Sequence, residues 1–144
     1  MTGNLQLKVQ KTDAEWRALL TPEQYIVTRE RRTEHAYTGT NWENMADGTY
    51  HCVCCGRLLF ASQAKFYSGV GWPAFCAPAK PDAVTEHDDR SFFIRRTEVR
   101  CADCGAHMGH VFNDGPNPTG RRYCTNGTAL EFRKAAPRQD VNAA

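Results

Sequence analysis

The chain contains seven cysteines, residues that can both bind metal ions and act as nucleophiles. Four belong to two Cys-x-x-Cys-Gly segments, Cys52–Gly56 and Cys101–Gly105. Four thiolates are the tetrahedral ligand set of closed structural zinc sites, and the glycine after each pair permits the tight turn that aims both sulfurs at one ion. Because such a site has no open position for substrate, the ion would stabilise the fold and take no part in catalysis. The pattern predicts a zinc site with the ligands Cys52, Cys55, Cys101 and Cys104.

Two alternatives remain open for these cysteines. All four could be buried or disulfide-bonded, and Cys54 could chelate together with Cys52 as a Cys-x-Cys pair. The symmetry of the two segments favours Cys55 over Cys54 as the ligand. An odd number of cysteines in a chain long enough to bury a core also argues against a secreted disulfide scaffold.

A further cysteine, Cys124, lies in the segment Arg-Arg-Tyr-Cys-Thr-Asn. The positive charges of Arg121 and Arg122 favour a thiolate, which is the nucleophilic form of cysteine. Asn126 follows two residues later, on the same face of an extended strand, and can donate a hydrogen bond to the sulfur or to a substrate oxygen. The local sequence fits either a nucleophile or a buried core cysteine.

Two histidines and one tryptophan lie in segments rich in glycine. His107 and His110 follow the second cysteine pair, and Gly109 between them could allow a bulge that turns both imidazoles toward one cavity. They could then move protons near neutral pH, although extra metal ligands or core residues would fit the same pattern. Trp72, which follows Gly69 and Gly71, could form an aromatic wall for an apolar or sulfur-bearing group, or could fill the core.

The elements that must position these residues begin with two short helices. Thr12 and Glu15 match a capping box, and Thr21 with Pro22 and Gln24 repeats the pattern, which predicts helices over about 13–20 and 22–31. After these, short aromatic and β-branched stretches alternate with Gly, Pro, Asn and Asp, as strands and turns do. The predicted strands are Thr49–Val53, Arg57–Phe60, Ser91–Arg100, His107–Phe112, Arg121–Cys124 and Thr128–Phe132.

Composition and order of elements place the chain among single-domain globular proteins. It has 144 residues, 41% of them hydrophobic, and a formal net charge of +2. We expect one mainly β or α+β domain over 1–144, with a core at about 12–133, a loop at Asp114–Gly120 and a flexible tail from 135.

The same composition excludes several classes of protein. The balanced charge argues against disorder and provides no basic stripe for nucleic acid. No apolar run approaches the roughly 18 residues of a membrane helix, and Met1–Trp16 lacks the apolar core of a signal peptide. We therefore expect a soluble, cytoplasmic protein without nucleic-acid or membrane partners.

Taken in order, these segments resemble the methionine-R-sulfoxide reductase B family. The resemblance spans about residues 12–133. It is carried by both cysteine pairs and by the segments Lys65–Phe75, Glu98–Cys101, Cys104–Phe112, Asp114–Gly120 and Arg122–Asn126.

The resemblance implies two antiparallel sheets with helices at the amino end and a zinc ion away from the active site. It implies reduction of methionine-R-sulfoxide, in proteins or as the free amino acid, with a thiol such as thioredoxin as reductant. Cys124 matches the nucleophile, which would become a sulfenic acid. Protons would come from His107, His110 or water. The residues that match the rest of the pocket are Trp72, Phe112, Asp114, Arg122 and Asn126.

The sequence departs from the family pattern at two positions. Val70 stands where the family often has a resolving cysteine, so the sulfenic acid would react with Cys76, Cys54 or an external thiol. Gly127 stands where a serine is common. The competing hypothesis is a noncatalytic, zinc-stabilised β domain that binds a protein partner through its Trp72 loop.

Overall fold

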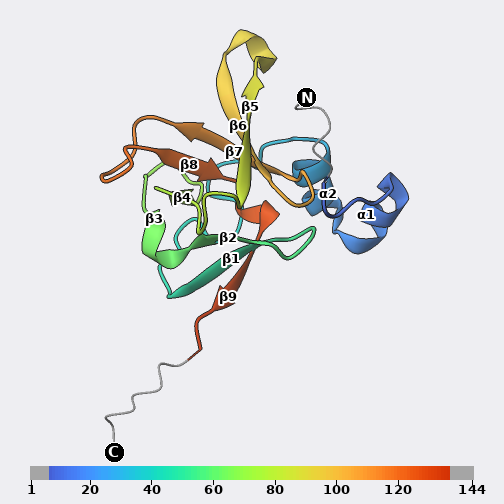
Figure 1. Ribbon diagram of the computed structural model, residues 1–144, viewed down its shortest axis with the longest axis horizontal. Helices are drawn as coiled ribbons and strands as arrows, with labels where there is room; N and C mark the ends of the chain where they lie inside the picture. The colour runs from blue at the N-terminus through green and yellow to red at the C-terminus, as the bar shows by residue number, and fades with distance from the viewer. Residues whose placement is uncertain (1–6, 137–144) are drawn as a thin grey trace, which may run out of the picture.

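The computed structural model describes residues 7–136, and its architecture is the expected one of two short helices followed by two antiparallel sheets (Figure 1). Of the tail predicted to be flexible, residues 137–144 lie outside the described part of the chain. Within residues 7–136, no helix is both long enough and apolar enough to cross a membrane.

Both helices begin where the capping signals predict. Helix α1 covers Asp13–Leu19, and the Thr12 hydroxyl accepts from the Glu15 amide while the Glu15 carboxylate accepts from the Thr12 amide. Helix α2 covers Pro22–Arg29, with Thr21 and Gln24 paired in the same way. Each box satisfies two amides that a helix start leaves unpaired, which explains how such short helices begin sharply.

The smaller sheet has three strands in the order β2-β1-β9. Strand β1 covers Gly48–Cys52 and lies between β2, Leu58–Ala61, and β9, Leu130–Lys134. All pairings are antiparallel, so the sheet joins the middle of the chain to its carboxyl-terminal part.

The larger sheet has six strands in the order β3-β4-β8-β7-β6-β5, also antiparallel. At its centre, β8 pairs with β7. The bounds are Lys65–Phe66 for β3, Ala74–Phe75 for β4, Val84–Asp89 for β5, Arg96–Cys101 for β6, His107–Phe112 for β7 and Arg122–Thr125 for β8.

Aromatic rings from both sheets form the core between them. Phe60 of β2 stacks on Phe75 of β4 with ring centroids 4.3 Å apart, and Tyr50 of β1 meets the same Phe75 ring edge-on at 5.1 Å. Tyr123 of β8 completes the group, 5.9 Å from Phe60. Since Tyr123 faces this core, its neighbours Arg122 and Cys124 face the opposite side of the sheet.

The predicted strand Ser91–Arg100 is wrong in its first part. Ser91–Phe93 forms a short 3-10 turn at the tip of a hairpin, with Phe92 and Phe93 in the left-handed region at φ 58° and 61°, and β6 begins only at Arg96. The other arm, β5, was not predicted, because its sequence Val-Thr-Glu-His-Asp-Asp lies at an edge of the sheet and is largely exposed, without apolar alternation.

The last predicted strand also needs a correction. Residues Gly127–Ala129 form a 3-10 turn, and β9 starts after it. This turn matters for the site because it follows Asn126 directly.

Candidate active site and metal centre

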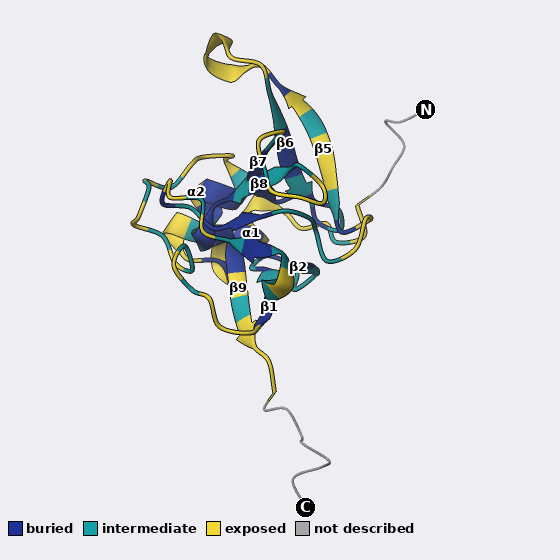
Figure 2. Ribbon diagram, turned by 90° about the vertical axis from the view of Figure 1, so that its left-hand side faces the viewer, coloured by how far each residue is buried: buried dark blue, intermediate teal, exposed yellow. Residues whose placement is uncertain are grey.

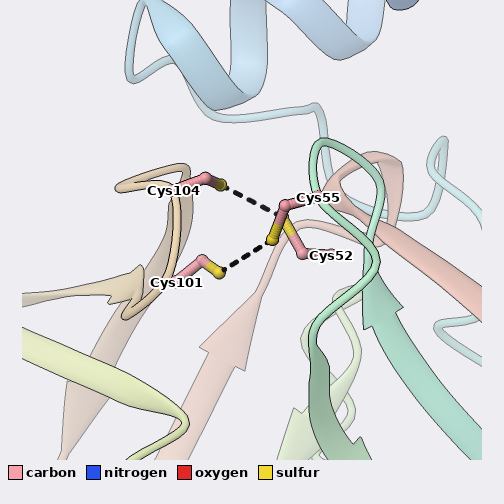
Figure 3. A group of neighbouring side chains, drawn as sticks. All are labelled: Cys52, Cys55, Cys101 and Cys104. Carbon is pink, nitrogen blue, oxygen red and sulfur yellow. Dashed lines mark hydrogen bonds between the residues drawn. The ribbon is translucent and has the colours of Figure 1, made fainter. Parts of the chain in front are cut away.

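Four sulfurs gather where the ends of the two sheets meet. The Sγ atoms of Cys52, Cys55, Cys101 and Cys104 all lie within 4.8 Å of one another (Figure 3). The closest pairs are Cys52–Cys104 at 3.6 Å and Cys55–Cys101 at 3.5 Å. Tetrahedral Zn–S bonds of 2.3 Å would place sulfurs about 3.8 Å apart, whereas a disulfide needs about 2.05 Å. The set therefore fits a metal ion held by four thiolates, as predicted from the sequence.

The two turns that carry these sulfurs have the same geometry. The Gly56 amide donates to the Cys52 carbonyl, and the Gly105 amide donates to the Cys101 carbonyl, both within 2.9 Å. The two glycines have φ of +82° and +77°, a conformation that residues with a Cβ rarely adopt. This explains why each pair is followed by glycine.

Cys54 is not part of the four-sulfur group. Its buried thiol donates to the Thr28 hydroxyl of α2 at 3.3 Å. Helix α2 also covers the centre through Arg29, whose guanidinium lies 4.3 Å from the Trp16 ring and donates to the Cys104 carbonyl. The helices at the amino end therefore shield the metal centre from solvent.

Cys124 lies at the middle of the larger sheet, on the face turned away from the aromatic core. It is the direct partner of His110 on β7 and of Ala74 on β4. A Cβ at Gly109 would come within 2.0 Å of the Cys124 carbonyl oxygen. Glycine at this position therefore lets β8 approach β7 closely enough to form the site.

Cys124 opens into a cavity of about 260 Å³. Apolar groups from two segments line it, namely Val70 and Trp72 from the loop before β4 and Phe112 from the end of β7. Its other lining residues are Thr33, Arg96, Gly109, His110, Arg122, Thr125 and Asn126. The cavity brings together Cys124, His110, Asn126, Trp72, Arg122 and Phe112, six of the eight residues named from the sequence outside the metal centre.

The other two, His107 and Asp114, lie beside this cavity and do not line it. Asp114 binds the Arg122 guanidinium through both carboxylate oxygens, at 2.9 and 3.2 Å. The ring of His107 lies 5.6 Å from that of His110 and lines an adjoining cavity. The pairing of β6 with β7 shifts register between Val99 and Arg100. This irregularity lets His107 and His110, three residues apart on β7, place both imidazoles on the same side of the sheet.

Each histidine is held by a carboxylate that the sequence reasoning missed. His110 Nε2 donates to Asp89 Oδ2 at 2.7 Å, and His107 Nδ1 donates to Glu98 Oε2 at 2.7 Å. The second nitrogen of His107, Nε2, is buried and has no hydrogen-bond partner among the described residues. These contacts determine which nitrogen of each ring remains available for chemistry.

Charge interactions keep both carboxylates ionised. The hydrogen bonds from His110 and Ser91 hold the pKa of Asp89 well below its usual range. Although burial opposes ionisation of Glu98, hydrogen bonds from His107 and Arg100 lower its pKa to about 2. Burial lowers the pKa of His110 in spite of Asp89, which favours a neutral ring at neutral pH.

The electrostatics of Cys124 differ from the sequence expectation. Burial raises the pKa of its thiol above the ordinary value, and the nearby Arg122 guanidinium lowers it by less than burial raises it. Arg121 does not contribute, because it pairs with Glu86 at 2.9 Å and packs on Tyr123. The resting protein therefore favours the thiol, with Arg122 as the group that stabilises the anion when it forms.

Glu34 lies in the chain between α2 and β1 and links the Trp72 loop to the turn after Asn126. Its sequence neighbours gave no indication of this role. Its carboxylate accepts from the amides of Gly127 and Thr128, and its carbonyl accepts from Trp72 Nε1 at 3.0 Å. Its amide donates to Asn126 Oδ1 at 2.9 Å, while Asn126 Nδ2 donates to the Met108 carbonyl. Asn126 is thus bonded at both ends of its amide, which makes it a link between β7, β8 and Glu34.

The structure shows what surrounds Val70 and Gly127, the two positions where the sequence departs from the family pattern. Val70 lines the Cys124 cavity. At Gly127, a Cβ would lie 1.7 Å from the Thr40 carbonyl oxygen, so the close approach of the Thr40 segment explains the glycine there.

Comparisons with known proteins agree with this arrangement. A family model described as the SelR domain matches residues 20–134. A relative from Agrobacterium fabrum, named peptide methionine sulfoxide reductase MsrB, is 54% identical over 125 residues, 87% of this chain and 93% of the relative. The chain belongs to the MsrB family.

Further members of the MsrB family match to the same extent. The MsrB relative from Hahella chejuensis is 52% identical over 128 residues, covering 89% of this chain and 92% of its own length. The one from Acinetobacter baumannii strain ATCC 17978 is 51% identical over 126 residues, covering 88% and 91%. The family resemblance seen in the sequence is therefore confirmed.

Proposed function

We propose that this protein reduces methionine-R-sulfoxide, carried in oxidised proteins and peptides or free, to methionine. The observation that carries the proposal is the position of Cys124, a partly exposed thiol in a small cavity walled by Trp72 and Phe112, in a chain of the MsrB family. A cavity of this size suits one side chain, and its aromatic walls suit a methyl group attached to sulfur.

The proposed reaction transfers one oxygen atom between two sulfurs. The Cys124 sulfur attacks the sulfoxide sulfur and forms an S–S bond as the S–O bond of the substrate breaks. The protonated oxygen then bonds to the Cys124 sulfur as the S–S bond breaks, so that Cys124 becomes a sulfenic acid and methionine leaves. The thiol is oxidised by two electrons and the sulfoxide is reduced by two. The proton that leaves the thiol is the one that the departing oxygen needs, so no net proton is consumed.

Three side chains support this transfer in the proposed mechanism. Arg122 stabilises the Cys124 thiolate as it forms, held in place by Asp114. His110, the direct cross-strand partner of Cys124, passes the proton to the departing oxygen, with its ring oriented by Asp89. His107 is the second candidate for the proton transfer, since its Nε2 is buried without a partner in the described chain.

An external thiol, such as one of a thioredoxin dithiol, regenerates Cys124 in this proposal. Its first sulfur forms a disulfide with Cys124 and releases water, and a second thiol then reduces that disulfide. Val70 cannot act as resolving residue, and Cys54 is buried beside the metal centre. Cys76 follows Ala74, the partner of Cys124, by two residues. Strand β4 ends at Phe75, so Cys76 lies outside the β4–β8 ladder, and Cys76 takes no part in the proposed cycle.

We also propose that the metal ion is zinc and that the protein works in the cytoplasm. Zinc would be held by Cys52, Cys55, Cys101 and Cys104, and its role would be to join the ends of the two sheets. The four thiolate ligands and the nucleophilic cysteine must all stay reduced, which is typical of a reducing compartment.

The test is turnover of the separate R and S epimers of methionine sulfoxide, with dithiothreitol as reductant. The wild-type protein should reduce only the R epimer, and Cys124→Ser should lose this activity while it retains the metal and its circular dichroism spectrum. Unchanged turnover in Cys124→Ser would refute the nucleophile. No turnover of either epimer by the wild type would favour the noncatalytic binding domain.

A further inference from the structure

A second cavity adjoins the one that contains Cys124. It has a volume of about 640 Å³, against about 260 Å³ for the first, and the two share Thr33, Arg96 and His110 as lining residues. Pockets that bind small ligands usually measure about 300–1,000 Å³, so the second cavity can hold more than one side chain. It therefore lies beside any substrate seated at Cys124.

The tip of the β5–β6 hairpin projects from the body of the molecule (Figures 1 and 2). Ser91 and Phe92 of this tip line the second cavity. The tip carries two neighbouring phenylalanines, Phe92 with 81% of its surface exposed and Phe93 fully exposed. Both have a left-handed backbone, which is unfavourable for bulky residues and is often retained at functional sites. Phe92 lines the second cavity and Phe93 does not.

The residue at the junction of the two cavities has an unused hydrogen-bond donor. Arg96 lines both cavities, and its Nε is buried without a hydrogen-bond partner within residues 7–136. A buried donor without a partner is costly, and a carbonyl oxygen of a bound chain would satisfy it. A polypeptide that passes from one cavity to the other has carbonyl groups to offer at this point.

Building on the proposed reductase function, we propose that the second cavity binds the polypeptide next to the oxidised methionine, with Phe92 in contact with an apolar side chain of that segment. Arg96 Nε would donate to a backbone carbonyl of the peptide where it leaves the Cys124 cavity. The preferred substrate is then an oxidised methionine beside an apolar residue in a flexible chain. Free methionine sulfoxide would use only the first cavity.

The experiment compares three R-sulfoxide substrates with dithiothreitol as reductant. They are the single residue with acetyl and amide ends, a hexapeptide with leucine on both sides of the sulfoxide, and the same hexapeptide with glycine on both sides. The variants are Phe92→Ala and, as a matched control, Phe93→Ala, which removes the same side chain from the same turn outside the cavity.

The wild type should prefer the leucine peptide to the glycine peptide. Phe92→Ala should lower kcat/KM for the leucine peptide about fivefold to tenfold, mainly by raising KM, and should leave the single residue unaffected. Phe93→Ala should change neither substrate. A structural role of Phe92 would instead lower kcat for the single residue as well.

Three results would overturn the assignment of the second cavity while the reductase stands. The first is equal turnover of the leucine and glycine peptides by the wild type. The second is an equal loss of kcat/KM for the single residue and the leucine peptide in Phe92→Ala. The third is a loss of kcat/KM in Phe93→Ala as large as in Phe92→Ala. If the wild type reduced none of the three substrates, the reductase function itself would be refuted.

Discussion

His110 and Cys124 lie directly opposite each other on the antiparallel strands β7 and β8. Side chains in such pairs have Cβ atoms about 4.5–5.5 Å apart and on the same face of the sheet. The hydrogen-bonded ladder of two central strands therefore determines the distance between the proposed proton carrier and the thiol. Asp89 then fixes the rotation of the imidazole from the β5–β6 hairpin.

The Asp89 contact can be tested with a neighbouring aspartate as control. Asp89→Asn removes the charge that favours a proton on His110, so the pKa of His110 should fall further and kcat should drop by about 10²-fold. Asp88 forms ion pairs with Arg90 and Arg95 in the described part of the chain, and neither of these lies at the histidines. Asp88→Asn should therefore leave kcat unchanged. Equal losses in the two variants would show a general effect on the hairpin.

The pKa of Cys124 gives a prediction on pH. Because burial raises the pKa of the thiol, its alkylation by iodoacetamide should increase with pH up to values above the ordinary cysteine range. Arg122 acts in the opposite direction, so Arg122→Ala should move the profile to still higher pH. Mass spectrometry of the peptide that contains Cys124 separates its alkylation from that of the other cysteines.

Arg121→Ala serves as the control for this profile, since Arg121 pairs with Glu86 and does not contact Cys124. Its profile should match the wild type. A wild-type profile centred below the ordinary thiol pKa would contradict the dominance of burial.

Metal binding is predicted to be essential for folding. Cys101→Ser removes one of four ligands, so the protein should lose stoichiometric zinc, measured by atomic emission, and its folded circular dichroism spectrum. The apparent binding free energy of structural zinc, about 10–16 kcal/mol in finger peptides, is as large as the stability of a whole domain. Cys54→Ser, outside the four-sulfur group, should keep the metal; a stable, metal-free Cys101→Ser protein would contradict the prediction.

Glu34 is predicted to stabilise the turn after Asn126. Glu34→Ala leaves the amides of Gly127 and Thr128 and the Thr128 hydroxyl without their acceptor, so unfolding by urea should show a loss of about 1–3 kcal/mol. Glu34→Gln retains acceptor oxygen and should lose less. A loss below a few tenths of a kcal/mol in Glu34→Ala would show that water replaces these contacts at little cost.

The grouping of the four cysteine sulfurs could be predicted from the sequence because its signal is local. Two cysteines followed by a glycine form one turn, and its ligand geometry depends on five consecutive residues. The immediate neighbours of Cys124, Trp72 and His110 fitted core residues as well as site residues, and it was the family resemblance that placed them in one pocket. For these positions, the fold had only to bring together segments that were already identified.

The residues that the sequence reasoning missed are those whose role depends on distant contacts. Asp89 and Glu98 lie in charged stretches that look like solvated surface, yet both are buried against the histidines. Glu34 follows a basic run at the end of α2 and meets its partners only through the tertiary fold. The elevated pKa of Cys124 was missed for the same reason, since burial cannot be inferred from the two adjacent arginines.

The bonds between Glu34 and the turn after Asn126 join residues 93 and 94 positions apart in the chain. A ribosome must therefore have released the chain through Thr128 before these bonds can form. Until then, the turn after Asn126 lacks the carboxylate that accepts from its amides. Copies that have not completed this turn would thus lack one support of the Cys124 cavity, and we expect the proposed reaction only from molecules that have completed folding.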